Sequence, residues 1–178
     1  LICNIMKRFI LFLAILSICG SAYSQKITKN EKDAFTGSHV IETSYVTLSD
    51  GLTCSIRSVN GIHILLVSFN GGDEIYTMEK NAQFMFLLQN DSIVTLANLE
   101  DAVGEYRSLN VGSTYISHFL LKTKYDLSEE QIHELQTHKI SNVRFYTTDG
   151  YIERKVSEKN AKKLLKLFNL INVSSVES

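Results

Sequence analysis

The sequence contains no proline and no tryptophan, and it has only 9 glycines in 178 residues. Average usage would supply roughly nine prolines in a chain of this length. Because proline is absent and glycine is scarce, proline-linker, collagen-like and low-complexity architectures are excluded. The formal net charge is -1, and this balance argues against nucleic-acid binding, which needs a clustered basic surface. The length suits one domain with a sizeable core.

The amino-terminal segment has the pattern of a secretory signal peptide. A basic pair follows Met6. An apolar run over 9–19 comes next, and a stretch of small residues then leads to Gln25. The pattern predicts that residues 1–24, an upstream extension plus the signal, are removed and that 25–178 form a single globular domain. The apolar run is shorter than the roughly 20 residues that span a bilayer, so no transmembrane span is expected in the mature chain.

The sequence contains 3 cysteines, of which only Cys54 lies beyond the predicted signal peptide. An exported domain with one cysteine has no internal disulfide, so its stability must come from its core. Cys54 stands in an alternating strand pattern and is interpreted as a small buried hydrophobe. Lipid anchoring at Cys19 is the less favoured alternative, because the bulky Ile18 stands where lipoprotein signals usually carry a small residue.

Turn signals predict a mainly antiparallel sheet built from hairpins. The strongest signal is Asn60-Gly61, because both residues tolerate positive φ, and a two-residue loop there places Cys54 opposite Val67. Two further strands are expected over 40–48 and 114–124. The predicted fold class is α+β, with about eight strands in a sandwich or partly open barrel.

Asn90-Asp91 predicts a second hairpin between 83–89 and 92–97. A two-residue loop would give it two apolar faces. One face would hold Phe84, Phe86, Leu88 and Ile93, and the other Met85, Leu87, Val94 and Leu96. Because both faces are apolar, this hairpin is predicted to be central and covered on both sides.

Asp149-Gly150 predicts a third hairpin, between 142–148 and 151–156, which sets Arg154 opposite Phe145 on the inward face. A guanidinium there must snorkel, stack on the ring or meet a carboxylate, because an unpaired buried charge is costly. We favour a structural role for this arginine, with an anionic ligand as the alternative. On that alternative, Arg154 is a candidate ligand-binding residue.

Two helices are expected, a short one inserted between strands and one at the carboxyl end packed on the sheet. Ser128 and Gln131 form a capping box that starts the first, which ends near His138. The second follows Ser157 and carries apolar residues at helical spacing, namely Ala161, Leu164, Leu165, Phe168 and Ile171. Helical turns are also expected over 31–36, after a loosely held arm, and near 99–103.

Two further residues are candidate ligand-binding positions. His63 shares a strand face with Leu65 opposite Ser58, where a hydrogen-bonded structural histidine is the favoured interpretation. Asp73 follows Gly71-Gly72 in a polar loop whose amides could bind an anion or whose acids could hold calcium. The loop lacks a full ligand set for either, so a plain connecting loop is favoured.

No motif for catalysis, metal binding or a cofactor is present. His133 and His138 are five residues apart, whereas a zinc-protease helix needs histidines four apart to converge on one metal. The acids Glu100, Asp101 and Glu105 could support glycoside hydrolysis only if they faced one another across a cleft. No nucleophile elbow or Ser-x-x-Lys pair occurs, so the sequence does not favour an enzyme.

Two short segments carry a resemblance to a known group. Asp33-Ala34-Phe35-Thr36-Gly37 followed by Ile41-Glu42-Thr43-Ser44 resembles uncharacterised exported proteins of Bacteroidetes, and the signal ending Tyr23-Ser24-Gln25 is similar to that group too. The resemblance implies export and lineage. It implies no activity and no site residues.

The leading functional hypothesis is an exported, non-catalytic domain that binds a small ligand or an envelope protein, in the periplasm or at the surface of a Gram-negative cell. A hydrolase of glycans or peptides without a recognisable motif is one alternative. A structural subunit of an envelope assembly, with contacts made by strand edges and by Tyr146 or Tyr151, is another. A flat apolar patch would favour a protein partner, and an enclosed apolar cavity would favour a small ligand.

Overall fold

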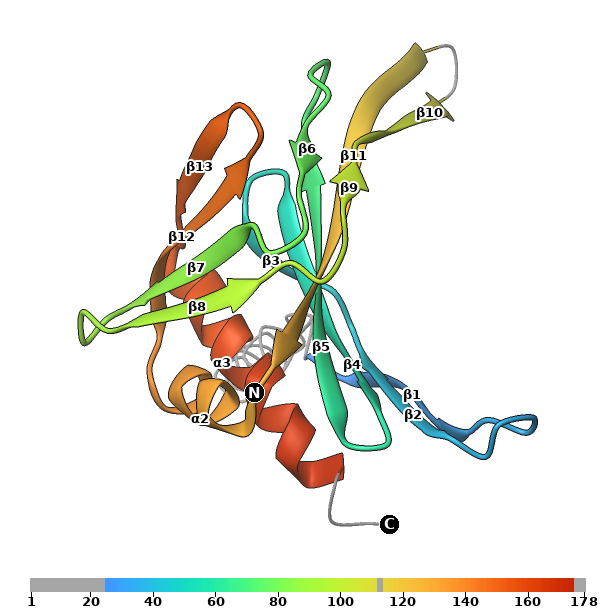
Figure 1. Cartoon of the computed structure of the whole chain (residues 1–178), viewed down its shortest axis with the longest axis vertical. Helices are drawn as coiled ribbons and strands as arrows, with labels where there is room; N and C mark the ends of the chain where they lie inside the picture. The colour runs from blue at the N-terminus through green and yellow to red at the C-terminus, as the bar shows by residue number, and fades with distance from the viewer. Residues whose placement is uncertain (1–24, 112–113, 175–178) are drawn as a thin grey trace, which may run out of the picture.

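The computed structural model describes residues 25–111 and 114–174, which form two antiparallel sheets, a short two-stranded ribbon and two helices (Figure 1). Neither sheet closes on itself within these residues. The α+β class and the helix at the carboxyl end are confirmed. The predicted signal peptide lies outside the described residues, so cleavage and export stay predictions.

The larger sheet contains seven strands in the order β1-β2-β4-β5-β11-β10, and β3 also pairs with β4. All its strand pairs are antiparallel. Its strands are β1 (Ile27–Lys32), β2 (His39–Thr43), β3 (Val46–Ser49), β4 (Leu52–Val59), β5 (Ile62–Asn70), β10 (Glu105–Val111) and β11 (Thr114–Leu127).

The beginning of this sheet corrects two expectations. The segment expected to be an arm is β1, paired with β2, and the expected helical turn is a tight turn held by Asp33. Its carboxylate accepts hydrogen bonds from the backbone amides of Thr36 (2.7 Å) and Phe35 (3.0 Å). The Thr36 amide, the Thr36 hydroxyl and then the Phe35 amide lower the pKa of Asp33. The strand expected over 40–48 is divided between β2 and β3.

The Asn60-Gly61 hairpin is confirmed. Asn60 has φ +50° and Gly61 has φ +83°, the backbone that a two-residue hairpin loop requires. Cys54 lies opposite Val67, as expected, and both side chains are buried. This hairpin forms the centre of the larger sheet.

The smaller sheet contains four strands in the order β13-β12-β7-β8. Its strands are β7 (Gln83–Leu88), β8 (Ile93–Ala97), β12 (Ile140–Thr147) and β13 (Gly150–Lys155). The helical turn expected near 99–103 is absent from the structure. That connection instead forms β9 (Ala102–Val103), which pairs with β6 (Thr77–Met78), and continues into β10.

The loop between β7 and β8 has three residues, 89–91, and not two. The Leu88 amide donates to the Ser92 carbonyl oxygen (2.9 Å), and Asp91 adopts the left-handed conformation with φ +64°. This is the geometry of a three-residue hairpin loop, which ends in a left-handed residue. Leu87 therefore lies opposite Ile93.

The extra loop residue moves the side chains of β8 to the opposite face from the one predicted, because side chains alternate along a strand. Val94 and Leu96 are buried on the face of Phe84 and Phe86, whereas Ile93 is 56% exposed. The predicted coverage on both sides is wrong. β8 is an edge strand, and Figure 1 shows β7 and β8 in front of α3 with no helix on their near side.

The β12–β13 hairpin also differs in register from the prediction. Thr147 lies opposite Gly150, so the loop is 148–149, and Arg154 lies opposite Val143 and not Phe145. A shift of two positions leaves Arg154 on the predicted face of the sheet, with Ile152 beside it and Val143 opposite. Arg154 is nevertheless exposed, because it lies near the end of the edge strand β13, so the predicted enclosed position against Phe145 is wrong.

Both predicted helices are present, α2 (Glu129–Thr137) and α3 (Glu158–Ser174). The capping box is confirmed, since the Gln131 amide donates to Ser128 Oγ (3.2 Å) and Gln131 Oε1 accepts from the Ser128 amide (2.9 Å). α3 packs against β3 and β4 of the larger sheet and against β12 of the smaller one. On α3 Leu167 is fully buried, whereas the predicted Leu165 is half-buried.

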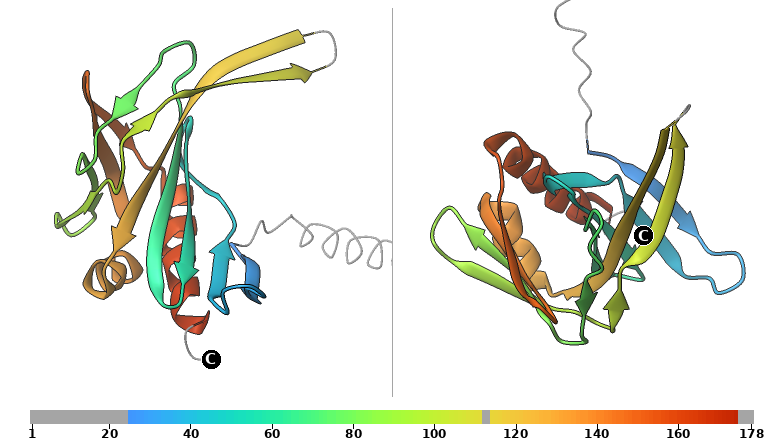
Figure 2. Two further views of the ribbon diagram at one scale, coloured as in Figure 1. Left: turned by 45° about the vertical axis from the view of Figure 1, so that its right-hand side comes forward. Right: turned by 90° about the horizontal axis from the view of Figure 1, so that it is seen from above.

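An aromatic cluster fills the space between the two sheets and α3. Phe84 of β7 has its ring centroid 5.1 Å from that of Tyr125 of β11 and 5.9 Å from that of Phe145 of β12. Phe86 contacts Phe168 of α3, at 6.4 Å between centroids. These rings are nearly inaccessible to solvent, and they hold the smaller sheet at a fixed angle to the larger one (Figure 2).

Candidate functional site

The outward side of the smaller sheet is an exposed, partly apolar surface, which we call the open face. It consists of Met85, Leu87, Ile93, Arg144, Tyr151 and Glu153. A depression of about 120 Å³ lies among five of these residues, all except Tyr151. The register of β8 creates this surface, because it sets Ile93 beside Leu87 instead of beside the buried phenylalanines.

A polar cluster borders the depression on the side of β12 and β13. Arg144 and Glu153 lie opposite each other across these strands, and Arg144 Nε lies 2.9 Å from Glu153 Oε2. The Asn142 side chain donates through Nδ2 to Glu153 Oε1 (3.2 Å). Hydrogen bonds from Arg144 and then from Asn142 hold the pKa of Glu153 below its usual value, so this acid stays ionised in mildly acidic medium.

Tyr151 extends the polar border. The Arg144 guanidinium carbon lies 4.6 Å from the centroid of the Tyr151 ring, a cation–π distance. Tyr146, paired with Tyr151 in the register, has its ring centroid 6.0 Å away. The open face therefore combines an apolar depression with a fixed cation, a fixed anion and the phenol ring of Tyr151, beside which the Tyr146 ring lies.

Arg154 is not part of the open face. Its Nη1 donates to the Glu153 carbonyl oxygen (3.1 Å), and its charge acts on Tyr76. The pKa of Tyr76 is nevertheless raised, mainly by the hydrogen bond that its hydroxyl donates to Glu74. Arg154 is thus an exposed cation near the loop that follows β5.

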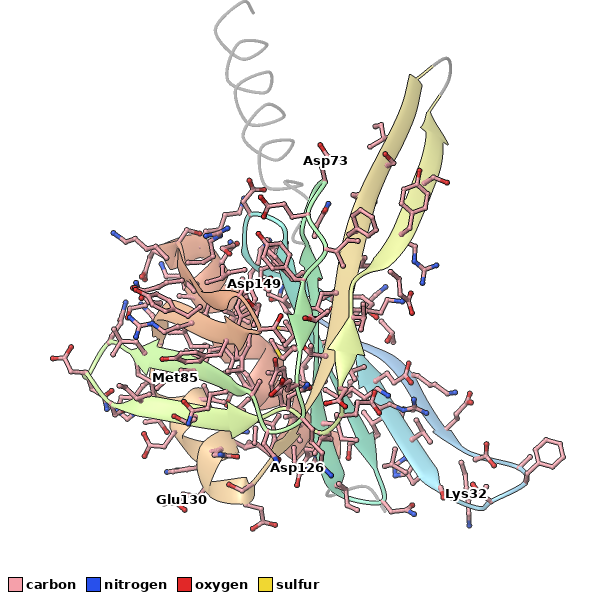
Figure 3. All side chains as sticks on the ribbon, turned by 45° about the horizontal axis from the view of Figure 1, so that its top comes forward. Lys32, Asp73, Met85, Asp126, Glu130 and Asp149 are labelled. Carbon is pink, nitrogen blue, oxygen red and sulfur yellow. The ribbon has the colours of Figure 1, made fainter. Side chains whose placement is uncertain are left out.

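Asp73 is exposed at the tip of that loop (Figure 3). The loop amides that were considered as an anion site are already used. Gly71 N donates to the Phe119 carbonyl (2.9 Å), and Gly72 N donates to Asn70 Oδ1 (3.0 Å). The structure therefore supports the connecting-loop interpretation, and it shows no ion pair between Asp73 and Arg154 among the described residues.

His63 lies at the opposite end of β5 from the Asp73 loop. It is opposite Ser58, as expected, and opposite Leu127 on the other side. Burial lowers its pKa, and Glu129 opposes this shift. Its Nδ1 is buried and has no hydrogen-bond partner in the described structure. With roughly 3.3 Å per residue along a strand, the 9 residues of β5 keep His63 apart from Asp73.

The acidic residues considered for hydrolysis do not face one another across a histidine. Glu100 pairs with Lys124 (2.8 Å), Asp101 accepts from the Lys80 amide (2.7 Å), and Glu105 pairs with Arg107. No group of three metal-ligating side chains occurs in the described part of the chain. Nothing in this geometry favours the hydrolase alternative.

No protein-family model, curated protein or solved structure matches this chain. None of the helices in the described residues is long and apolar enough to span a bilayer. The open face is therefore interpreted from its own geometry. Sequence reasoning missed it because it treated Asn90-Asp91 as a two-residue loop. Asp91, an aspartate at the end of a loop without glycine, is the signal that points to a left-handed third position.

Proposed function

We propose that this chain is an exported, non-catalytic domain of the cell envelope that binds a protein partner through the open face. The observation that carries the proposal is the exposed Ile93 beside Leu87 and Met85, at a depression bordered by Arg144 and Glu153. An apolar centre with a polar border is typical of protein interfaces.

The size of the depression favours a protein over a small molecule. Small-ligand pockets measure roughly 300–1,000 Å³ and enclose most of the ligand, whereas this depression measures about 120 Å³. It suits one apolar side chain of a partner. The partner's neighbouring polar groups would meet Arg144 and Glu153 at the border.

Site-specific photo-crosslinking in the exporting cell tests the proposal. A photoreactive residue at position 93 is compared with one at position 62, because Ile62 has a similar exposure (62%) but lies at the β4–β5 turn. We expect one adduct of defined mass from position 93, none from position 62, and loss of the adduct on Arg144→Glu. Equal labelling at both positions, or an adduct insensitive to Arg144→Glu, would overturn the proposal.

The structural-subunit alternative has one observation in its favour, the β10–β11 ribbon. β11 pairs with β5 only from Leu120 onward, so its first half and β10 extend beyond the body as a two-stranded ribbon (Figures 1 and 2). Tyr106 and Ile116 on this ribbon are exposed. Isolated two-stranded ribbons are marginal in water, which suits a segment that is covered in an assembly. Crosslinking from position 116 in place of position 93 would favour this alternative.

A further inference from the structure

A second hollow lies where the end of β8 meets the end of β11 and the start of α2. It measures about 420 Å³ and shares no lining residue with the depression of the open face. Its lining comes from three segments distant in sequence, namely Lys80 and Asn81, then Thr95 with 97–99, and finally Asp126, Ser128 and Gln131. This volume falls in the range of small-molecule sites, roughly 300–1,000 Å³.

Buried hydrogen bonds hold the walls of this hollow in place. Asn98, 1% exposed, donates through its side-chain amide to the carbonyl oxygens of Glu79 (3.1 Å) and Glu100. Its backbone carbonyl accepts from the Asn81 amide (2.8 Å), and it bridges to Tyr125 of β11. Asn98, through its backbone and its buried side chain together, thus joins the segment before β7 to the ends of β8 and β11.

Two further hydrogen bonds close the sides. Asp101 Oδ1 accepts from the Lys80 amide (2.7 Å), which orients the turn that carries the Lys80 side chain. Gln131 Nε2 of α2 donates to the Thr95 carbonyl oxygen (2.9 Å). The hollow is therefore formed before any ligand arrives, and binding would cost little ordering of the protein.

The hollow presents one cation and one anion that are not used in ion pairs. Lys80 and Asp126 line it, and neither takes part in an ion pair within the described structure, whereas the adjacent Glu100 and Lys124 are paired at 2.8 Å. The remaining lining is polar, with hydroxyls of Thr95 and Ser128 and amides of asparagine and glutamine, or aliphatic, with Ala97 and Leu99. No aromatic ring of the residues that the structure describes lines it, so a ligand would be held by charge and hydrogen bonds and not by stacking.

We propose that this hollow binds a small zwitterion of the free amino-acid class, with the ligand carboxylate at Lys80 and its ammonium group at Asp126. A zwitterion matches both charges and leaves the site neutral. A neutral sugar would leave both charges without partners, and a peptide end would offer only one of the two groups. Asp126 and Glu130 lie at the end of the molecule opposite Asp73 (Figure 3), away from the β10–β11 ribbon.

Calorimetric titration and thermal melting of the purified protein with each of the twenty free amino acids test this inference. We expect at least one of them to bind and to raise Tm. Its N-acetyl form and its methyl ester, each lacking one charge, are expected to bind about tenfold more weakly or worse. Failure of all twenty, or equal binding of a blocked form, would overturn the inference, as would binding of glucose in their place.

Variants assign the two charges. Lys80→Met and Asp126→Asn, both at exposed positions, are each expected to weaken binding about tenfold or more. Glu130→Gln, exposed in the first turn of α2 outside the lining, is the matched control and is expected to bind like the wild type. Wild-type affinity in both Lys80→Met and Asp126→Asn would contradict the assignment. If either variant does not fold, the blocked ligands with the wild-type protein decide the question.

Discussion

Ile93 lies directly opposite Leu87 in the β7–β8 hairpin, on the face that points away from the aromatic core. This pairing depends on the three-residue loop that ends at Asp91 in the left-handed conformation. A loop shorter by one residue would bury Ile93 and expose Val94 in its place. The open face is therefore a consequence of one loop residue.

The left-handed conformation of Asp91 predicts a stabilising substitution. Asp91→Gly should raise the free energy of unfolding by roughly 0.5 kcal/mol, because glycine adopts positive φ without steric cost. Asp149→Gly is the control, since Asp149 is at the tip of the β12–β13 hairpin and its φ is not positive. That change should leave stability unchanged or lower it. Urea unfolding measures both, and equal shifts would argue against the loop geometry.

Truncation of Asn98 should lower stability strongly, because its side-chain amide is buried and donates two hydrogen bonds. Asn98→Ala should lower the free energy of unfolding by about 2–4 kcal/mol, since it leaves the Glu79 and Glu100 carbonyl oxygens without this donor. Asn169→Ala, at an exposed position on α3, should cost less than about 1 kcal/mol. Chemical denaturation distinguishes them, and a small effect at Asn98 would show that the junction it holds is not rigid.

His63 should make stability depend on pH near neutrality. Burial lowers its folded-state pKa, so between the folded and unfolded pKa values the unfolded chain binds more protons. The contribution of neutral His63 to the free energy of unfolding is fully present above its pKa in the unfolded chain, about 6.5. It is lost as the pH falls through the lower pKa of the folded state. His63→Gln should flatten the stability profile in this window, whereas exposed His133→Gln should not. A profile unchanged by His63→Gln would place the titration elsewhere.

The Cys54 thiol should be unreactive toward thiol reagents in the folded protein. It is fully buried, and desolvation raises its pKa to about 12, so almost no thiolate forms at pH 8. A thiol reagent should modify Cys54 only as fast as the chain unfolds globally. Rapid modification under native conditions would show that the β4–β5 hairpin opens locally.

The parts of the fold that could be predicted from sequence are those set by neighbouring residues. Asn60-Gly61 supplies both positive φ angles, and Ser128 with Gln131 supplies both capping hydrogen bonds. Each feature works within a few residues, whatever the rest of the chain does. The hairpin and the start of α2 were therefore predicted correctly.

The candidate sites depended on longer-range geometry. The register of Arg154 was wrong by two positions, so it lies opposite Val143 and not Phe145. Its place near the end of the edge strand β13 leaves it exposed, and this removed the enclosed environment on which its candidacy depended. Lys80, Asn98 and Asp126 come together only because β8 and β11 meet, which no local pattern encodes. Predicting the open face required the length of the loop that ends at Asp91. The sequence lacks there the glycine that usually marks a left-handed residue.

The affinity of the crosslinked partner for Ile93→Lys, compared with Ile62→Lys, tests the central claim most directly. Both positions are exposed, so both variants should fold with Tm near that of the wild type. We predict that Ile93→Lys raises the Kd for the partner about tenfold or more, because a lysine charge would be desolvated at the apolar centre of the interface, while Ile62→Lys leaves it within about twofold. Equal Kd values for the two variants would contradict the assignment of the open face as the binding surface.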